Sequence, residues 1–324
     1  MADVIFPARR RLLATALLAP AVRAQPVYPD RPITLIVPFA PGGIADLSAR
    51  AVGDEMAHRL GQSIVVDNRP SAGSIVASTA VARARPDGYT LLLMSNGNAV
   101  SAGLFKTLPY DTLKAFTPVS TLGFFDLGLF VAADSRFKSL SDVLAFARTH
   151  PGRLNIGSIA VGSTQQLAAR LFTTVAGIDA LIVPYRGTPA VFTALRAGEV
   201  DLSFEISAAM VSQVKAGVVR ALAVTSSQHN PALPQVPTVR QAGVAGYDVA
   251  SWNAVAAPAG TPPAVVERLN RAVHDAVTQP GVRDKLAALG VRLQAGTPAE
   301  LQALLVSEMQ RWSAVMRAAG ITPQ

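Results

Sequence analysis

The sequence predicts an α/β protein made of two domains. Short apolar runs alternate with amphipathic runs along residues 33–319, which is typical of strands that are each followed by a helix. The chain has 324 residues, of which 50% are hydrophobic, and this exceeds what one hydrophobic core usually holds. Large apolar residues are plentiful, so the composition excludes a disordered chain.

Residues 1–24 are predicted to be a signal peptide and are set apart from the fold. Arg9, Arg10 and Arg11 precede an apolar run over 12–22 that is shorter than the ~20 residues needed to span a bilayer. Small residues before Gln25 allow cleavage after Ala24. We therefore expect a periplasmic protein, exported by the general or the twin-arginine route. A disordered basic tail is the alternative interpretation.

Charge and cysteine content exclude several functions. The formal net charge of +8 is scattered rather than gathered in a stripe, which argues against a nucleic-acid partner. The chain has no cysteine, which excludes disulfides, thiolate catalysis and cysteine-ligated metals. No cluster has the spacing of metal ligands. We expect no cofactor and no metal, and a monomer is the default state.

The first domain is predicted to open with strand–loop–helix units. The strands are expected over 33–39, 63–67 and 90–94, and the helices over 45–60 and 75–84. Gly61 is a suitable residue to end the first helix. The third strand is expected to end in a loop at 95–98.

Residues 117–133 form a long apolar stretch, which predicts a strand that crosses between the domains. The second domain then follows the same pattern. Helices are expected over 141–149 and 164–176, with another after 188, and strands over 154–159, 181–184, 201–206 and 220–225. Residues 226–248 are rich in Pro, Gly, Ser and Gln and are interpreted as a surface connection.

The chain is expected to return to the first domain through a strand over 250–257. Helices over 262–278, 280–289 and 298–319 would close the fold, and Thr297-Pro298 is a strong helix start. We therefore assign residues 25–122 and 250–324 to one lobe and 123–249 to the other. The hinges are expected near 120–126 and 248–252.

The sharpest local feature is the motif FAPGGIAD at residues 39–46, between a predicted strand and a predicted helix. Gly42 and Gly43 lack Cβ atoms, so the backbone can approach a ligand closely. The helix N-terminus offers unpaired N–H groups and a partial positive charge, which suit an anion. The alternative is a tight turn in which Asp46 is only an acid in the first turn of the helix.

Three more loops have the same character, at 71–74, 95–98 and 162–165. Each combines glycine with small hydroxyl or amide side chains at a strand end, where ligands bind in α/β sheets. If they face one cleft, they form an uncharged hydrogen-bonding cage. Arg186 is the nearest candidate cation, although a solvated loop arginine is the alternative.

Enzyme motifs are missing from the sequence. It holds no GxGxxG, GxxxxGK[ST], GxSxG or HExxH pattern. The four histidines lie away from the glycine-serine loops, so none is a ready base. An exported hydrolase that uses Ser74 or Ser163 as nucleophile stays as the alternative function.

The ordered motifs resemble those of the substrate-binding receptors of tripartite tricarboxylate transporters, often called Bug receptors. The resemblance runs from Tyr28 to about Ile321. Its landmarks are YPDRPI (28–33), VPFAPGG (37–43), NRPSAG (68–73), PDGYTLL (86–92), LPYD (108–111), GST (162–164), VPYRG (183–187), RALAVT (220–225), PALPQVPTV (231–239) and APAGTP (257–262).

This resemblance implies a type II periplasmic-binding fold, in which two α/β lobes joined by crossing strands close around an organic acid. It also implies a membrane transporter as partner, with a signalling sensor as the alternative. The site residues implied by matching motifs are Phe39, Pro41, Gly42, Gly43, Asp46, Ser95, Asn96, Gly162, Ser163, Thr164 and Tyr185.

Five positions depart from the family pattern. Ile44 stands where a small residue is frequent, which makes this rim of the site bulkier and more apolar. Glu205 replaces a frequent Asp, and Gln166 replaces a frequent His. Ile159-Ala160 replaces a frequent Ala-Gly. We include Ile44 and Glu205 among the expected ligand-binding residues.

Overall fold

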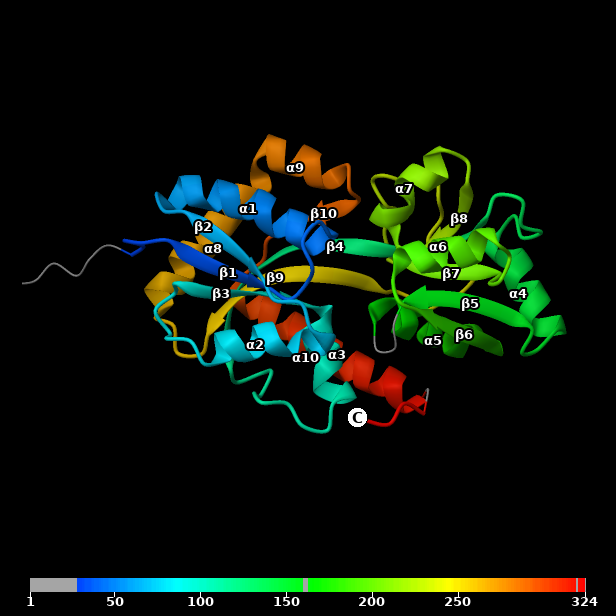
Figure 1. The fold of residues 1–324 in the computed structure, drawn as a ribbon, viewed down its shortest axis with the longest axis horizontal. Coiled ribbons are helices and arrows are strands. Elements are labelled where there is room, and N and C mark those ends of the chain that lie inside the picture. Colours follow the sequence, from blue (N-terminus) through cyan, green and yellow to red (C-terminus); the bar gives the residue numbers. More distant parts are fainter. Residues whose placement is uncertain (1–27, 160–162, 319, 324) are drawn as a thin grey trace, which may run out of the picture.

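The computed structural model describes residues 28–159, 163–318 and 320–323. The expected signal peptide and its cleavage site therefore lie outside the described residues. Figure 1 shows two lobes, with the long strand β4 (Phe116–Ala132) running from one into the other. The predicted α/β class is confirmed.

The first lobe is built on the sheet order β2-β1-β3-β9-β4. Strands β1 (Ile33–Val37), β2 (Ile64–Asn68) and β3 (Thr90–Ser95) are parallel to one another. The returning strand β9 (Ala250–Pro258) pairs antiparallel with β3 and β4. The short strand β10 (Val291–Leu293), which was not predicted, pairs antiparallel with β4.

The second lobe continues the order as β4-β7-β5-β6, and β8 also pairs with β4. Its strands are β5 (Leu154–Ile159), β6 (Ala180–Tyr185), β7 (Leu202–Ile206) and β8 (Val219–Val224). Strand β4 exchanges partners in mid-course: Asp126 still pairs with Ala250 of β9, whereas Leu127 pairs with Ile206 of β7.

Helices cover both faces of the first sheet, because its strands are apolar on both sides. On β1, Leu35 and Val37 pack with α1 (Ile44–Leu60), α8 (Pro263–Thr278) and α9 (Pro280–Ala287). Ile36, which points to the opposite face, packs with α2 (Ile75–Ala82), α3 (Asn96–Leu104) and α10 (Pro298–Ala318). The short helix η1 (Ala72–Ser74) leads into α2.

The second lobe carries α4 (Leu140–Thr149), α5 (Thr164–Ala176), α6 (Thr188–Arg196) and α7 (Ser207–Lys215). Helix α10 also contacts α5, so one buried cluster extends from the first lobe into the second. No helix in the described parts of the chain is both long and apolar enough to cross a bilayer.

One prediction about local structure was wrong, and another was incomplete. Residues 96–98 are the first turn of α3 rather than a loop, because Ser95 and Asn98 form a capping box around the helix start. Residues 226–248 are not merely a surface connection. Tyr247 is fully buried, and its hydroxyl donates to the carbonyl of Ala168 over 2.9 Å. Composition alone could not show this tertiary contact.

Candidate functional site

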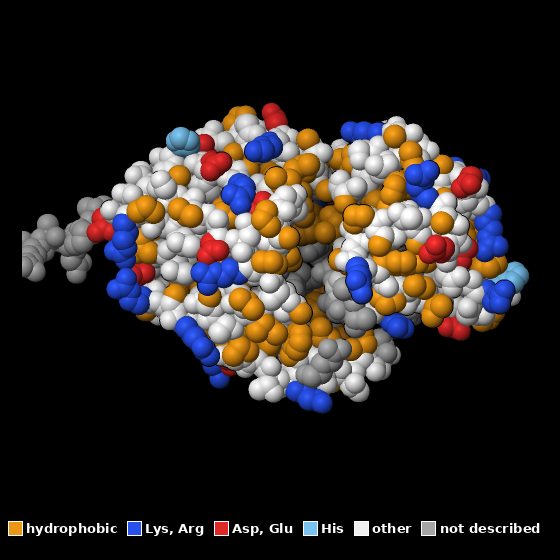
Figure 2. All heavy atoms as spheres, in the orientation of Figure 1, with side chains coloured by type: hydrophobic (Ala, Val, Ile, Leu, Met, Phe, Trp, Pro, Cys, Tyr) orange, Lys and Arg blue, Asp and Glu red, His pale blue; other side chains and the backbone are white. Residues whose placement is uncertain are grey.

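A cavity of about 300 Å³ lies between the two lobes. Figure 2 shows the molecule hollowed there, with hydrophobic side chains gathered along the hollow. The cavity lies at the carboxyl ends of β1, β3, β5 and β7, which is where α/β sheets bind ligands. None of the described residues that line it has an ionisable side chain.

Several helices begin at this cavity. The N-cap residues of α1, α2, α3, α5 and α7 all line it, and they are Gly43, Ser74, Ser95, Ser163 and Ile206. The first N–H groups of a helix have no partner within the helix, and its N-terminus carries about half a positive charge. These helix N-termini favour an anion, and no cationic side chain is found among the described residues that line the cavity.

The loop before α1 is held by the carboxylate of Asp46. Gly42, whose φ of 84° suits glycine, donates its N–H to Asp46 Oδ2 over 2.9 Å. Arg50 and Asn68 also donate to this carboxylate, and Asn68 donates to the carbonyl of Phe39. Burial would raise the pKa of Asp46, but the hydrogen bonds from Arg50, Gly42 and Asn68 outweigh it and lower the pKa. Asp46 thus shapes the loop and does not line the cavity.

Helices α3 and α5 meet across the cleft between the lobes. Asn96 Nδ2 donates to Thr164 Oγ1 over 3.4 Å, and Asn96 Oδ1 accepts from the indole N–H of Trp312 over 2.8 Å. Ser163 Oγ accepts from the N–H of Gln166 and donates to the carbonyl of Ile159. The lobes therefore touch through polar groups at the edge of the cavity.

The structure brings together about half of the expected site residues. Those that line the cavity are Phe39, Gly43, Ile44, Ser95, Ser163 and Thr164. Those that do not line it are Pro41, Gly42, Asp46, Asn96, Tyr185 and Glu205. Gly162 lies outside the described residues. Tyr185 is the last residue of β6, and the exposed Arg186 follows it. In the order β4-β7-β5-β6, strand β6 lies farthest from β4.

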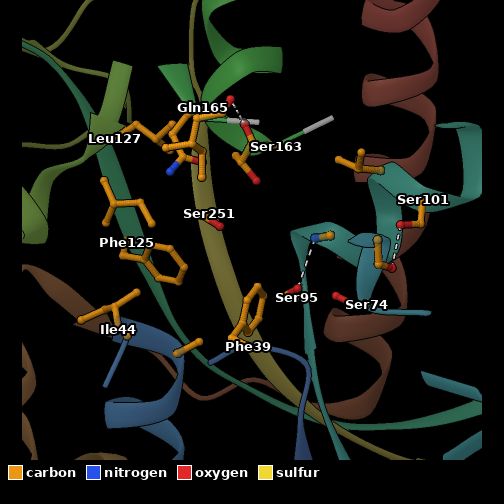
Figure 3. A pocket seen from close by; sticks show the side chains of 18 of the residues that line it. Phe39, Ile44, Ser74, Ser95, Ser101, Phe125, Leu127, Ser163, Gln165 and Ser251 are labelled. Atoms are coloured by element: carbon orange, nitrogen blue, oxygen red, sulfur yellow. Dashed lines mark hydrogen bonds between the residues drawn. The ribbon is translucent and has the colours of Figure 1, made fainter. Parts of the chain in front are cut away.

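Sequence reasoning missed part of the lining. The crossing strands contribute Phe125, Leu127 and Ser251, and α3 contributes Val100, Ser101 and Leu104. Figure 3 shows Phe125 and Leu127 on one side of the cavity and Ser95, Ser74 and Ser101 on the other. No local motif marks residues on a crossing strand, because only the pairing of β4 with β7 and β9 places them at the cleft.

Glu205 lies directly behind this lining. Its side chain is fully buried on β7, and Oε2 accepts from Thr188 Oγ1 over 2.9 Å. Burial raises the pKa of Glu205 to about 7, against the opposing effect of hydrogen bonds from Thr188 and the cavity residue Gln165. At neutral pH this carboxyl group is therefore close to half-protonated.

Replacing Glu205 by Gln is expected to change how stability depends on pH. Between about pH 4.5 and 7 the folded protein holds a proton at Glu205 that the unfolded chain has released, so stability falls as pH rises through this range. Across that range E205Q should gain up to about 3 kcal/mol relative to the native protein. Urea unfolding at several pH values measures this difference. The control is E267Q, because Glu267 is exposed. If the stability of E205Q varies with pH in the same way as that of the native protein, Glu205 does not have a raised pKa.

The hydrolase alternative lacks a base at this site. Within the described ranges, no histidine lines the cavity or hydrogen-bonds to Ser74 or Ser163. His229 is exposed in the connection after β8. The part of the chain that the structure describes also shows no His, Asp or Glu group able to hold a metal ion.

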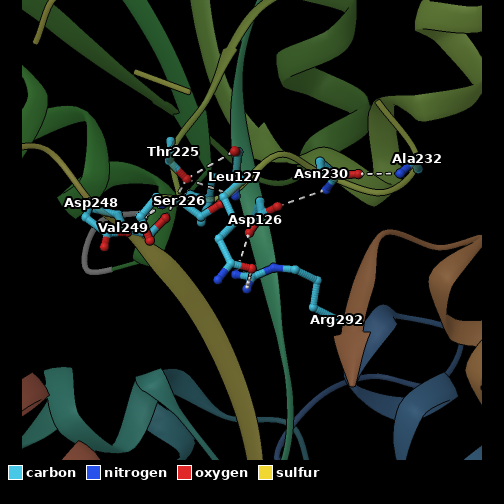
Figure 4. A network of polar contacts seen from close by, with 11 residues as sticks. Asp126, Leu127, Thr225, Ser226, Asn230, Ala232, Asp248, Val249 and Arg292 are labelled. Atoms are coloured by element: carbon cyan, nitrogen blue, oxygen red, sulfur yellow. Dashed lines mark hydrogen bonds and ion pairs between the residues drawn. The ribbon is translucent and has the colours of Figure 1, made fainter. Parts of the chain in front are cut away.

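A polar network lies where β4 changes partners (Figure 4). The buried carboxylate of Asp126 accepts from Asn230 Nδ2 over 3.1 Å and from Arg292 over 3.4 Å. Burial raises the pKa of Asp126, although Arg292 opposes this. Thr225 Oγ1 contacts the carbonyls of both Leu127 and Val249, so it ties the two crossing segments together.

Comparisons with known proteins identify relatives of similar length and fold. The chain is 35% identical over 310 residues to Protein BugT of Bordetella pertussis, covering 95% of each chain. Two solved structures, each 35% identical, come from Rhodopseudomonas palustris. One is Rpa4515 with adipate, with a TM-score of 0.81 over 92% of this chain and 100% of that one. The other is MatC with bound malate, with a TM-score of 0.76 over 89% and 99%.

The family match covers most of the chain. The profile described as the tripartite tricarboxylate transporter family receptor matches residues 48–321. The resemblance seen in the sequence motifs and the expected fold of a periplasmic solute-binding protein are both confirmed. The chain therefore belongs to the tripartite tricarboxylate transporter receptor family, whose members include the Bug proteins.

Proposed function

We propose that this protein is an extracytoplasmic receptor that binds a small organic carboxylate for a tripartite tricarboxylate transporter. The observation that carries the proposal is the set of helix N-termini around a cavity lined, in the described chain, by no ionisable side chain. Such N–H groups bind anions. Relatives of the same fold were solved with adipate and malate, which supports a carboxylate here.

In this proposal the ligand closes the two lobes. One lobe comprises residues 25–122 and 250–324, and the other comprises residues 123–249. The lobes would rotate where β4 exchanges partners at Asp126 and Leu127 and where the chain enters β9 after Val249. The carboxylate would bridge the loop before α1 and the start of α5. Closure excludes water, which strengthens each electrostatic contact.

The closed form would present a joint surface of both lobes to a membrane component of the transporter in the periplasm. Membership of the receptor family supports this partner. A receptor that reports to a sensor would use the same closed surface.

A thermal-shift screen against organic acids tests the proposal. A ligand at about 100 times its dissociation constant should stabilise the folded protein by about 2.7 kcal/mol. The methyl ester of the same acid is the matched control, because it keeps the shape and lacks the charge. The proposal fails if no acid stabilises the protein, or if ester and acid stabilise it equally.

A further inference from the structure

A buried carboxyl group lies behind the part of the cavity that the second lobe lines. Glu205 is the last residue but one of β7, and the next residue, Ile206, lines the cavity and is the N-cap of α7. Gln165, the second residue of α5, also lines the cavity (Figure 3), and its side-chain amide hydrogen-bonds to Glu205. One side chain therefore separates Glu205 from a ligand at the start of α5.

Glu205 lacks a countercharge. The elements packed most closely against β7 are β4, β5, α5, α6 and α7. Their charged residues are Asp126, Arg170, Arg196 and Lys215. None of these four contributes to the raised pKa of Glu205, which burial causes. A negative charge on Glu205 would therefore act on an anion in the cavity without a neighbouring cation to offset it.

The proton on Glu205 decides which end of the Gln165 amide is left for the cavity. An ionised carboxylate only accepts hydrogen bonds, so it holds the NH₂ group of Gln165 and leaves the amide oxygen for a ligand. A protonated carboxyl group can donate to that oxygen while it still accepts from Thr188, and the NH₂ group of Gln165 is then free to donate. Protonation thus removes a negative charge and frees a donor, and both changes favour an anion.

Resting on the proposed function, we propose that Glu205 is a positioning residue that acts through Gln165 and makes the affinity for the carboxylate depend on pH. The carboxylate bridges the loop before α1 and the start of α5, and it binds more tightly when Glu205 is neutral. Binding therefore takes up a proton near neutral pH. Because the pKa of Glu205 in the free protein is about 7, affinity should be constant well below this pH and should fall above it.

Calorimetric titration at several pH values tests this inference. The probe is the acid among adipate, malate, hexanoate and benzoate that stabilises the protein most in the thermal-shift screen. Between about pH 6 and about pH 8.5 the dissociation constant should rise at least about tenfold, as expected for one charge near an anion at an effective dielectric constant of about 20. At about pH 7, titrations in two buffers with different ionisation enthalpies should show an uptake of up to about half a proton per ligand.

Two variants separate the roles of Glu205 and Gln165. E205Q resembles the neutral state, because its amide can donate to Gln165 and accept from Thr188. Its dissociation constant should vary with pH only through the ionisation of the probe, and should stay near the native value at about pH 6. Q165M keeps the length of the side chain and removes the amide, so it should reduce the tenfold change to about threefold or less. The control is E267Q, which changes an exposed glutamate and should keep the native pH response.

The outcomes distinguish this inference from the proposed function. If the native dissociation constant varies with pH no more than that of E205Q, the role of Glu205 is overturned, whereas the proposed function stands because the acid still binds. A pH response in Q165M as large as the native one overturns the role of Gln165. If none of the four acids binds, the inference falls together with the proposed function.

Discussion

Replacing Gly43 by Trp is expected to weaken carboxylate binding by at least about 100-fold while the protein stays folded. Gly43 lines the cavity, and its φ of −77° and ψ of 167° are ordinary for any residue. A Cβ atom there would lie 3.8 Å from the carbonyl oxygen of Ala40, which is normal contact. The indole would occupy much of a cavity of about 300 Å³.

Calorimetry with the best acid from the screen measures the loss, and thermal unfolding of the free protein shows that the fold is kept. The matched control is G281W, because Gly281 lies exposed in α9 with open space around it. G42W is a poorer test, since the φ of 84° at Gly42 strains any side chain and that residue does not line the cavity. Native affinity in G43W would place the ligand elsewhere.

Replacing Arg292 by Met is expected to destabilise the protein by about 3–5 kcal/mol at neutral pH. Asp126 is fully buried where β4 passes between the lobes, and Arg292 is its only ion-pair partner among the described residues. Without the guanidinium, the carboxylate keeps the Asn230 amide but loses its countercharge. The stability lost in R292M should become smaller as pH falls, because protonation of Asp126 removes the buried charge.

Urea unfolding of R292M at several pH values measures this cost. R271M is the control, because Arg271 and Glu267 form an exposed ion pair of the kind that contributes about 0–1 kcal/mol. Adding D126N to R292M should restore much of the stability, since no charge is then buried unpaired. If R292M and R271M cost the same, Asp126 is not stabilised by this pair.

Much of the secondary structure could be predicted because it is encoded locally. The strand at residue 33 and the helix at residue 44 follow from apolar periodicity and from the two glycines between them. Helix α7 and strand β10 were missed. Residues 207–215 have a weak amphipathic pattern and form a helix against β4 and β8, and the three residues of β10 form a strand only by pairing with β4.

For the candidate site, too, some residues could be predicted from local sequence and others could not. The loops at 39–46, 71–74, 95–98 and 162–165 were found because glycine and small hydroxyl residues at strand ends are a local signal, and each has a described residue at the cavity. Tyr185 and Arg186 carry a similar signal. They lie away from the cavity, because the order of strands places β6 at the edge of its sheet.

The sequence by itself determined the class of fold, the family and the donor-rich loops, since each depends on residues close together in the chain. Only the tertiary structure decided which helix ends converge and which residues of the crossing strands line the cavity. Phe125, Leu127 and Ser251 reach the cleft because β4 pairs with β9 of the first lobe and β7 of the second, and both strands are distant from β4 in sequence. Pairing between strands that are far apart in sequence cannot be predicted from any short segment of the chain.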